Sequence, residues 1–288
     1  MRKVIVFTLT LLTAILSASA LDRYTVASFN ILGGDVKNPD TKERAEMGRD
    51  IAMFCDFDIF GVQEMRRPQA EIYAEGGVYQ IAGEVVAPNI EVPQWQRWGN
   101  FIFFKKDKFN LLKEGHFWLS TTPDSPSIGW TEKQYRICNY VKLEDRQSGR
   151  QIYFFNLHQG LTSDARLKAM QVIKKKIAEI VEDDSTVFLT GDFNADCSEE
   201  SIKNLLADGF FIDTWLKSAT KPFGPKGTFC KANHDKPLCD GNSKTENKID
   251  YIFATKNVSV LKCGVLTFNV DNKYPSDHLP IMAVVEIK

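Results

Sequence analysis

The chain has 288 residues, of which 43% are hydrophobic and 25% charged, enough for one large domain or two modest ones. Its 36 basic and 37 acidic side chains give a formal net charge of −1. This balance argues against the broad basic surface that drives nonspecific binding to nucleic acid, although it is compatible with a locally basic groove.

The first twenty residues have the three parts of a secretory signal. Arg2 and Lys3 form a positive start, residues 4–15 are almost continuously apolar, and Ala18-Ser19-Ala20 has the A-x-A pattern of a cleavage site. The apolar run is about a dozen residues, whereas a membrane span needs roughly 20. We therefore predict an exported protein, periplasmic or extracellular, with no transmembrane segment. Its mature chain is expected to begin at Leu21 and to form a single domain over 21–288 that works as a monomer.

Six cysteines lie in the predicted mature chain, an even number that permits disulfides in an exported protein. Cys230 and Cys239 bracket a short polar loop and are the predicted pair. No CxxC spacing occurs, so a cysteine metal site is disfavoured. The other four cysteines can equally be free and buried.

Hydrophobic periodicity predicts many strands separated by a few helices. The predicted strands, in chain order, are 24–30, 58–62, 101–104, 111–119, 137–143, 152–157, 186–190, 249–254, 258–268 and 281–287. The predicted helices are 41–54, 164–181 with Ser163 as its cap, and 198–206. This order favours an α/β or α+β sandwich, with two sheets packed face to face and helices outside. The first and middle segments of the chain each have a strand with a polar end, then a helix, then a buried strand that ends in a carboxylate. This shared order predicts two similar halves.

Polar residues stand at the ends of these apolar strands. Taken singly, each is more often a turn former or an exposed end, and a lone histidine is more often structural. Asp250 is different, because a carboxylate between Ile249 and Tyr251 is expected to be partly buried and to need a cation or a charged histidine. As a set these positions predict an active site: Asn30, Glu64, His158, Asp192, Asn194, Asp250, Asp277 and His278.

These residues occur in the segments ASFNI, GVQEM, NLHQG, GDFNAD, KIDYIF and SDHLP, in that order, across 29–280. The ordered set resembles the endonuclease/exonuclease/phosphatase superfamily, whose members share the deoxyribonuclease I-like fold. The resemblance implies a four-layer α/β sandwich of two mostly antiparallel β-sheets flanked by helices, with the site at one edge of both sheets. Residues 117–123 are also similar to a segment of exported bacterial members.

The resemblance further implies an exported, divalent-metal-dependent phosphoesterase that hydrolyses phosphate monoesters or diesters by in-line attack of water. Asn30 and Glu64 would hold Mg²⁺ or Mn²⁺, because these hard cations prefer oxygen ligands, and Asp277 would complete or support the site. The metal would polarise a phosphoryl oxygen and stabilise the leaving oxygen.

The remaining residues of the set are expected to be catalytic. His278 would be a general base or a phosphate-binding group, with Asp250 fixing its tautomer. Asp192 is the other candidate base, Asn194 would hold the attacking water or a phosphate oxygen, and His158 would donate a hydrogen bond to the phosphate. The choice of base between Asp192 and His278 stays open.

The substrate is less well defined. Many members carry Thr-His followed by an acid, whereas this chain has Leu157-His158-Gln159-Gly160. Arg136 and Arg166 are candidate phosphate contacts, although an ion pair or a solvated helix face explains either equally well. Trp95, Trp98 and Trp130 are candidates to stack a base or a sugar, and His116 and His234 are assigned no role.

Nuclease, sugar- or inositol-phosphate phosphatase and phospholipid-cleaving enzyme all remain open within this reaction class. The slight acidity counts against a duplex-specific nuclease. A binding protein that kept the fold without catalysis is the alternative from a different class. It would be expected to lack metal or histidine positions, and none is missing.

Overall fold

The computed structural model describes residues 23–229 and 247–288 of the chain. The predicted leader, Cys230, Cys239 and His234 lie outside these residues, so export and the predicted disulfide stay predictions. Within the described part no helix has the length and apolar character needed to cross a membrane. The four described cysteines are free: Cys138 and Cys263 are buried, Cys55 is half-buried and Cys197 is exposed.

Two six-stranded sheets form the centre of the molecule. The first has the order β11-β12-β1-β2-β4-β3, with β1 Arg23–Asn30, β2 Ile59–Met65, β3 Tyr79–Ala82, β4 Gly99–Lys105, β11 Val258–Val265 and β12 Ile281–Ile287. The second has the order β5-β6-β7-β8-β10-β9, with β5 Phe109–Trp118, β6 Ile137–Asp145, β7 Gln151–His158, β8 Thr186–Asp192, β9 Phe211–Asp213 and β10 Asp250–Thr255. Each sheet has one parallel pair, β1-β2 or β7-β8, and the other neighbours are antiparallel. The mostly antiparallel character predicted from the sequence is confirmed.

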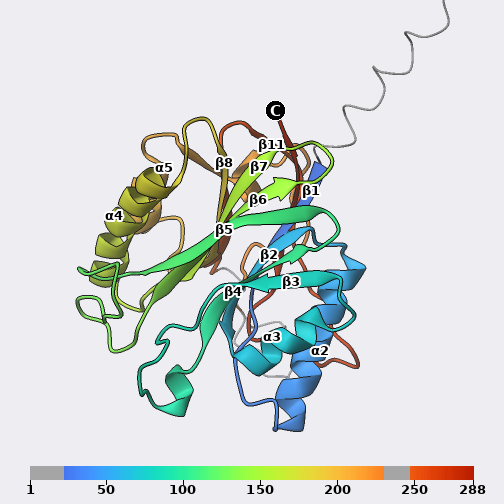
Figure 1. Cartoon of the computed structure of the whole chain (residues 1–288). Coiled ribbons are helices and arrows are strands. Elements are labelled where there is room, and N and C mark those ends of the chain that lie inside the picture. The colour runs from blue at the N-terminus through green and yellow to red at the C-terminus, as the bar shows by residue number, and fades with distance from the viewer. Residues whose placement is uncertain (1–22, 230–246) are drawn as a thin grey trace, which may run out of the picture.

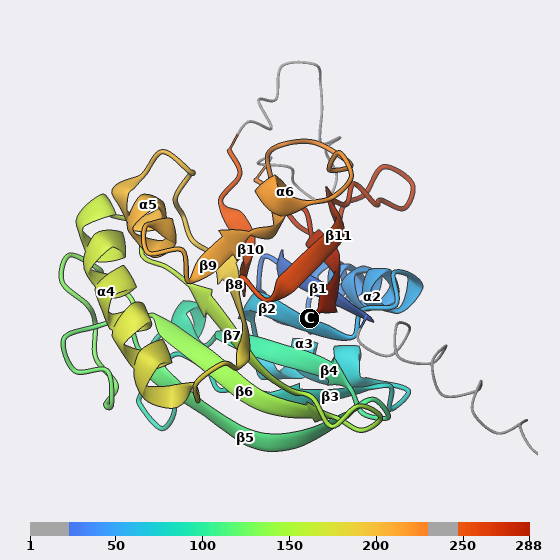
Figure 2. The same ribbon diagram turned by 90° about the horizontal axis from the view of Figure 1, so that it is seen from above.

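Helices cover the outer face of each sheet, as Figures 1 and 2 show. The first sheet carries α2 (Pro39–Phe54) and α3 (Arg67–Ala74), and the second carries α4 (Ser163–Ile180) and α5 (Glu200–Leu206). The short α6 (Thr214–Lys217) and the 3-10 helix η1 (Gln94–Gln96) lie in connections. The predicted four-layer sandwich is therefore confirmed. Each parallel pair is bridged by one long helix, α2 or α4, which agrees with the predicted similarity of the halves.

Alternation along the strands builds one core between the sheets and one under each helical layer. In β1, Tyr24 and Val26 belong to the central core, whereas Ala27 and Phe29 pack in the core under α2 and α3. In β7, Phe154 faces the centre and Phe155 packs in the core under α4 and α5. In these two strands, alternate residues therefore face the opposite sheet and the residues between them face the helices.

A buried polar layer separates the central apolar core from the edge where the candidate residues lie. The Gln63 side-chain amide donates to Ser28 Oγ at 3.1 Å and to Asn156 Oδ1 at 2.6 Å, which links the two sheets. Asn156 in turn donates to the carbonyls of Val62 and Phe101. These amides leave room for nothing larger than hydrogen at Gly61, where a Cβ atom would lie 2.5 Å from Asn156 Cγ.

We expect Gly61→Ala to lower the free energy of unfolding by about 1–3 kcal/mol, because the added methyl group must displace a hydrogen-bonded amide in a close-packed layer. Urea denaturation followed by tryptophan fluorescence measures the change. Gly76→Ala is an unsuitable control because Gly76 has φ +81°, so Gly264→Ala, where the nearest atom is 3.1 Å away, serves as the milder comparison. Equal stability of the Gly61 variant and the wild type would contradict this packing account.

The structure adds short elements that periodicity did not predict: α3, β3, β9 and α6. Most span only three or four residues, which is too short for a repeating apolar pattern to register. Ser163 is the first residue of α4 rather than its cap, because Thr162 Oγ1 accepts the hydrogen bond from the Ala165 amide at 3.3 Å.

Candidate active site

The inward-facing rows of four strands turn from apolar to polar at one edge of the sandwich. The rows of β1, β7 and β8 end in Asn30, His158 and Asp192, and that of β10 begins at Asp250. Asp192 is in register with His158 on one side and with Asp250 on the other. Strand pairing alone therefore places these three side chains next to one another, and all of them are buried.

Glu64 reaches the same edge through a bulge. By simple alternation after Phe60 and Val62, its side chain would face the helices rather than the opposite sheet. The β2-β4 register shifts between Val62 and Met65, and Glu64 has φ +59°, in the left-handed region. Such bulges redirect side chains next to functional sites. The Glu64 carboxylate consequently accepts a hydrogen bond from the Asn30 amide at 3.2 Å.

Side chains of three other candidate residues lie close to one carboxylate oxygen, Asp192 Oδ2. It accepts from Asn30 Nδ2 at 3.1 Å, and it lies 3.4 Å from His158 Nε2 and 3.7 Å from His278 Nε2. The other oxygen, Oδ1, accepts the backbone N–H of Asn194 at 2.9 Å. Three candidate side chains from three segments therefore converge on one atom, with Asp192 only 2% exposed.

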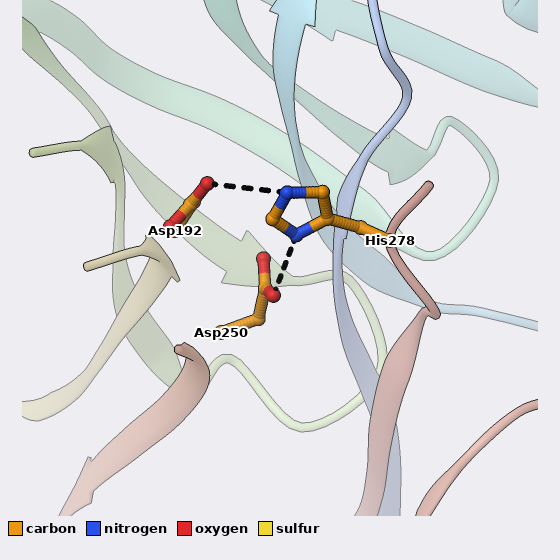
Figure 3. A group of neighbouring side chains, drawn as sticks. All are labelled: Asp192, Asp250 and His278. Atoms are coloured by element: carbon orange, nitrogen blue, oxygen red, sulfur yellow. Dashed lines mark hydrogen bonds and ion pairs between the residues drawn. The ribbon is translucent and has the colours of Figure 1, made fainter. Parts of the chain in front are cut away.

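His278 and Asp250 form a buried pair. His278 Nδ1 lies 2.8 Å from Asp250 Oδ2, and Figure 3 shows the imidazole ring between this carboxylate and that of Asp192. Ser276 fixes the segment that carries the histidine, since its hydroxyl donates to the Asn30 carbonyl at 2.7 Å and accepts from the His278 amide at 3.1 Å. The predicted need of Asp250 for a charged partner is met by His278.

Burial and mutual charge decide the protonation of these groups. Burial raises the pKa of Asp192 to about 7, and the Asp250 carboxylate adds to the rise while His278 opposes it. Burial alone would lower the pKa of His278, but the carboxylates of Asp250 and Asp192 outweigh it and raise the pKa to about 10. For His158, burial lowers the pKa well below its usual value, and Arg136 and His278 lower it further. At neutral pH the site therefore holds a charged His278 and a neutral His158.

A pocket of about 340 Å³ opens above this cluster, with a mainly polar lining. Six of the eight residues predicted for catalysis or metal binding reach its surface: Glu64, His158, Asp192, Asn194, Asp277 and His278. Asn30 and Asp250 lie behind them and touch them through hydrogen bonds. Burial raises the pKa of Asp277, an effect that the charge of His278 counters.

Arg136 also lines the pocket, although it is only 3% exposed. Its guanidinium lies over the Trp98 ring at 5.4 Å, and Trp98 in turn lies 5.3 Å from the His158 ring. Glu132 is 3.8 Å from Nε, yet Nε and Nη1 have no hydrogen-bond partner among the described residues. A buried donor without an acceptor is costly, so this guanidinium is suited to an anion entering the pocket.

Arg166 is absent from the pocket lining, and its ion pair corresponds to the structural alternative that the sequence left open. Its guanidinium pairs with Glu199 and donates to the carbonyls of Gly160 and Leu161, at 3.3 and 2.8 Å. In the other half, Arg44 does the same for Ile31 and Leu32, at 2.9 and 2.8 Å. Each arginine stands early in the long helix and holds the loop that follows a site residue, His158 or Asn30. Nothing in the sequence distinguished Arg44 from the other charged residues of 41–54.

The three candidate tryptophans lie in different environments in the structure. Trp95, on η1, lines the pocket and is 55% exposed. Trp98 is buried beside His158, and Trp130 packs against the core under α4 and α5. His116, which was given no role, stacks edge-on against Trp118 away from the pocket lining.

The model of the Endonuclease/Exonuclease/phosphatase family matches residues 27–278, nearly all of the described chain. The chain belongs to this family. A solved endonuclease/exonuclease/phosphatase family protein from Bacteroides thetaiotaomicron is 30% identical, with a TM-score of 0.81 over 92% of this chain and 95% of that one. A mannosyl-6-phosphatase of B. thetaiotaomicron VPI-5482 is also 30% identical, with a TM-score of 0.79 over 91% of this chain and 99% of that one.

Two further matches are more distant, the first of them a likeness in fold alone. TDP2 of D. rerio, solved with a single-strand DNA product, is 18% identical with a TM-score of 0.70 over 92% of this chain and 99% of that one. An uncharacterised protein of Acanthamoeba polyphaga mimivirus is 26% identical over 180 residues, which are 59% of this chain and 63% of that relative. The alignment thus spans less than two thirds of the viral protein.

The oxygen donors of this family member suit a hard divalent cation. Glu64 and Asp277 present carboxylates to the pocket, and Asn30 lies against Glu64. The metal-site spacing found among the described residues belongs to another set, in which atoms of Asp192, Asp250 and His278 lie within 4.8 Å of one another. In that set His278 Nδ1 and Asp250 Oδ2 are already engaged with each other. Glu64 and Asp277 are more accessible than the members of that set, which leaves their carboxylates available to a cation.

Proposed function

We propose that this chain is a divalent-metal-dependent phosphomonoesterase for small, hydroxylated substrates of the sugar-phosphate type. The proposal depends above all on Asp192 Oδ2, where Asn30, His158 and His278 converge beneath one open pocket. A carboxylate, a charged histidine and a neutral histidine at this spacing can activate water and hold a phosphoryl group together.

Asp192 is the better candidate for the base. With its pKa raised to about 7 by burial and by Asp250, it can accept a proton from water near neutral pH. The backbone N–H of Asn194 and the Asn30 amide orient its two oxygens. His278 carries its proton under the same conditions, because Asp250 holds it charged, and it would donate from Nε2 to a phosphoryl oxygen.

His158 and Arg136 would stabilise the charge that develops on the phosphoryl group. The neutral His158 has one N–H to donate, and Arg136 offers buried donors that have no acceptor in the described part of the chain. Fixed donors in a buried site need little reorganisation as charge develops, which makes them effective in the transition state.

Glu64, Asn30 and Asp277 would hold Mg²⁺ or Mn²⁺. When bound, the ion supplies positive charge to the phosphoryl and leaving oxygens. Carboxylates close together repel one another, and the raised pKa values of Asp192 and Asp277 reflect the burial of negative groups here. A divalent cation would relieve that cost.

Two observations support a small monoester as substrate. The pocket of about 340 Å³ is compact and polar, with the exposed Trp95 at its rim as a surface for a sugar ring. A solved protein 30% identical to this chain is a mannosyl-6-phosphatase. The likeness to TDP2, at 18% identity, extends to the fold and does not favour a nuclease.

The purified protein is expected to hydrolyse mannose 6-phosphate and p-nitrophenyl phosphate with Mg²⁺ at least 10-fold faster than bis-p-nitrophenyl phosphate or single-stranded DNA, with Mn²⁺ as the second metal tested. Release of inorganic phosphate and gel electrophoresis of the DNA measure the two activities. A preference for the diester would favour the nuclease alternative. Absence of turnover of every substrate would favour a binding protein on the same fold.

Export after cleavage near Ala20 is part of the proposal, motivated by the leader-like start of the chain. N-terminal sequencing of the protein recovered outside the cytoplasm should begin at or near Leu21. An uncleaved N-terminus would contradict it.

A further inference from the structure

A second groove adjoins the catalytic pocket. It has a volume of about 630 Å³ and lies between the start of α3 and the connection over residues 85–97. Arg66 lines both spaces, and η1 separates them, with Trp95 on the pocket side and Gln94 and Gln96 on the groove side. A ligand in the pocket can therefore extend past Arg66 into the groove.

Three guanidinium groups line this groove: Arg66, Arg67 and Arg97. Among the residues that the structure describes, none of the three has a carboxylate within ion-pair distance. By contrast, Arg44, Arg49 and Arg166 each have one. In a chain of net charge −1, three arginines around one groove with no ion pair to a described residue are a marked local excess of positive charge.

Asp35 is the acid in the groove lining, and it hydrogen-bonds to other groups and has no ion pair with these arginines. Its Oδ1 accepts the Lys37 amide at 3.0 Å, and its Oδ2 accepts Gln94 Nε2 at 3.3 Å. The remaining polar lining is made of amide side chains, among them Asn89, Gln94 and Gln96. Guanidinium forks together with amide donors match the oxygens of a phosphate.

Contacts with the backbone and with neighbouring groups position all three arginines. The Arg66 amide donates to Gln69 Oε1 at 3.0 Å, so Arg66 sits where α3 begins and where the helix dipole adds positive potential. Arg67 lies over the Phe101 ring at 5.6 Å, and Arg97 donates through Nε to the Val92 carbonyl at 3.4 Å. These contacts leave the remaining guanidinium N–H groups available to a ligand.

We propose that the groove binds a second phosphate group of the substrate, so that the preferred substrates are small bisphosphates. This inference rests on the proposed phosphomonoesterase function and names its substrate class. The phosphate to be cleaved occupies the pocket at Asp192, and the leaving portion of the molecule carries its other phosphate past Arg66 toward Arg67 and Arg97.

The test compares mannose 1,6-bisphosphate with mannose 6-phosphate and with a short 5′-phosphorylated oligothymidine. The wild type is expected to give a kcat/KM for the bisphosphate at least about 10-fold above that for the monophosphate. Arg67→Gln/Arg97→Gln is expected to reduce this ratio about 10-fold, mainly through the KM for the bisphosphate. The control Lys168→Gln/Lys175→Gln removes the same charge from exposed positions on α4 and should leave the ratio within about twofold of the wild type.

Calorimetric titration of the bisphosphate into metal-free protein gives a second readout, in which only the groove variant should lose affinity. A ratio near one in the wild type, a ratio unmoved in the groove variant, or a preference for the oligonucleotide would each overturn the inference. Turnover of the monophosphate in those cases would leave the proposed function standing, whereas a wild type inactive on every phosphomonoester would refute that function itself.

Discussion

Asp192→Asn and His278→Ala are each expected to lower kcat by about 10²–10⁴-fold, with smaller changes in KM. Asp192 Oδ2 is the atom on which Asn30, His158 and His278 converge, so its loss removes the candidate base and the alignment of its neighbours. His278→Ala removes the charge that Asp250 stabilises at 2.8 Å. Initial rates of phosphate release from p-nitrophenyl phosphate measure both.

His116→Ala is the matched control, because His116 lies in β5 outside the pocket lining and contacts Trp118 instead. It should retain nearly full activity. Near-wild-type kcat in Asp192→Asn would refute the assignment of the base. Because these substitutions remove buried charged groups, circular dichroism and thermal unfolding should first show that each variant is folded. Asp250→Asn gives a second test of the Asp250–His278 pair, because it removes the carboxylate charge that holds His278 in its protonated form.

Removal of the divalent metal is expected to cause the second large loss of activity. EDTA should abolish activity, and Mg²⁺ or Mn²⁺ should restore it, because the pocket gathers carboxylates that need a divalent counter-charge to bind an anionic substrate. Glu64→Gln is expected to raise the Mg²⁺ concentration for half-maximal activity at least about 10-fold, since it replaces a charged ligand with a neutral one. Calorimetric titration of Mn²⁺ into the protein gives the binding constant without turnover.

The comparison of Glu64→Gln with Asp250→Asn distinguishes the two donor sets. If the ion lies at Glu64, Asn30 and Asp277, the first substitution weakens Mn²⁺ binding and the second mainly lowers kcat. The reverse result would place the ion among Asp192, Asp250 and His278, whose ligand atoms lie within 4.8 Å of one another. Full activity in EDTA would contradict the metal requirement altogether.

The duplicated plan of the fold gives the two halves complementary tasks. In each, a parallel strand pair and its bridging helix present a polar strand end, and an early helical arginine, Arg44 or Arg166, holds the following loop. The first half contributes Asn30 and Glu64, and the second contributes His158 and Asp192. Because the two sheets face each other, these ends meet at one edge and one pocket serves both.

Local pattern was sufficient for most of the strands and for the polar residues at their ends, whereas the four-layer arrangement and the roles of those residues were implied by the family resemblance. Alternating apolar residues define strands such as 152–157, and a polar residue that follows such a run, like His158, must lie at a strand end. The buried position of Asp250 and its need for a charged partner could also be foreseen, since a carboxylate between apolar residues cannot remain alone. The short β3 and β9 carry too few residues for such a pattern.

Other features depend on contacts between distant segments. The bulge that turns Glu64 toward Asn30 arises from the β2-β4 register, which no local pattern encodes. Arg136 and Arg166 were equal candidates in the sequence, yet burial beside Trp98 brings one into the pocket while Glu199 and two carbonyls hold the other in a loop. The groove at Arg66, Arg67 and Arg97 likewise exists only because α3 and residues 85–97 pack side by side. Periodicity specifies which face of a strand is buried, but only the packed chain specifies which distant groups share a cavity.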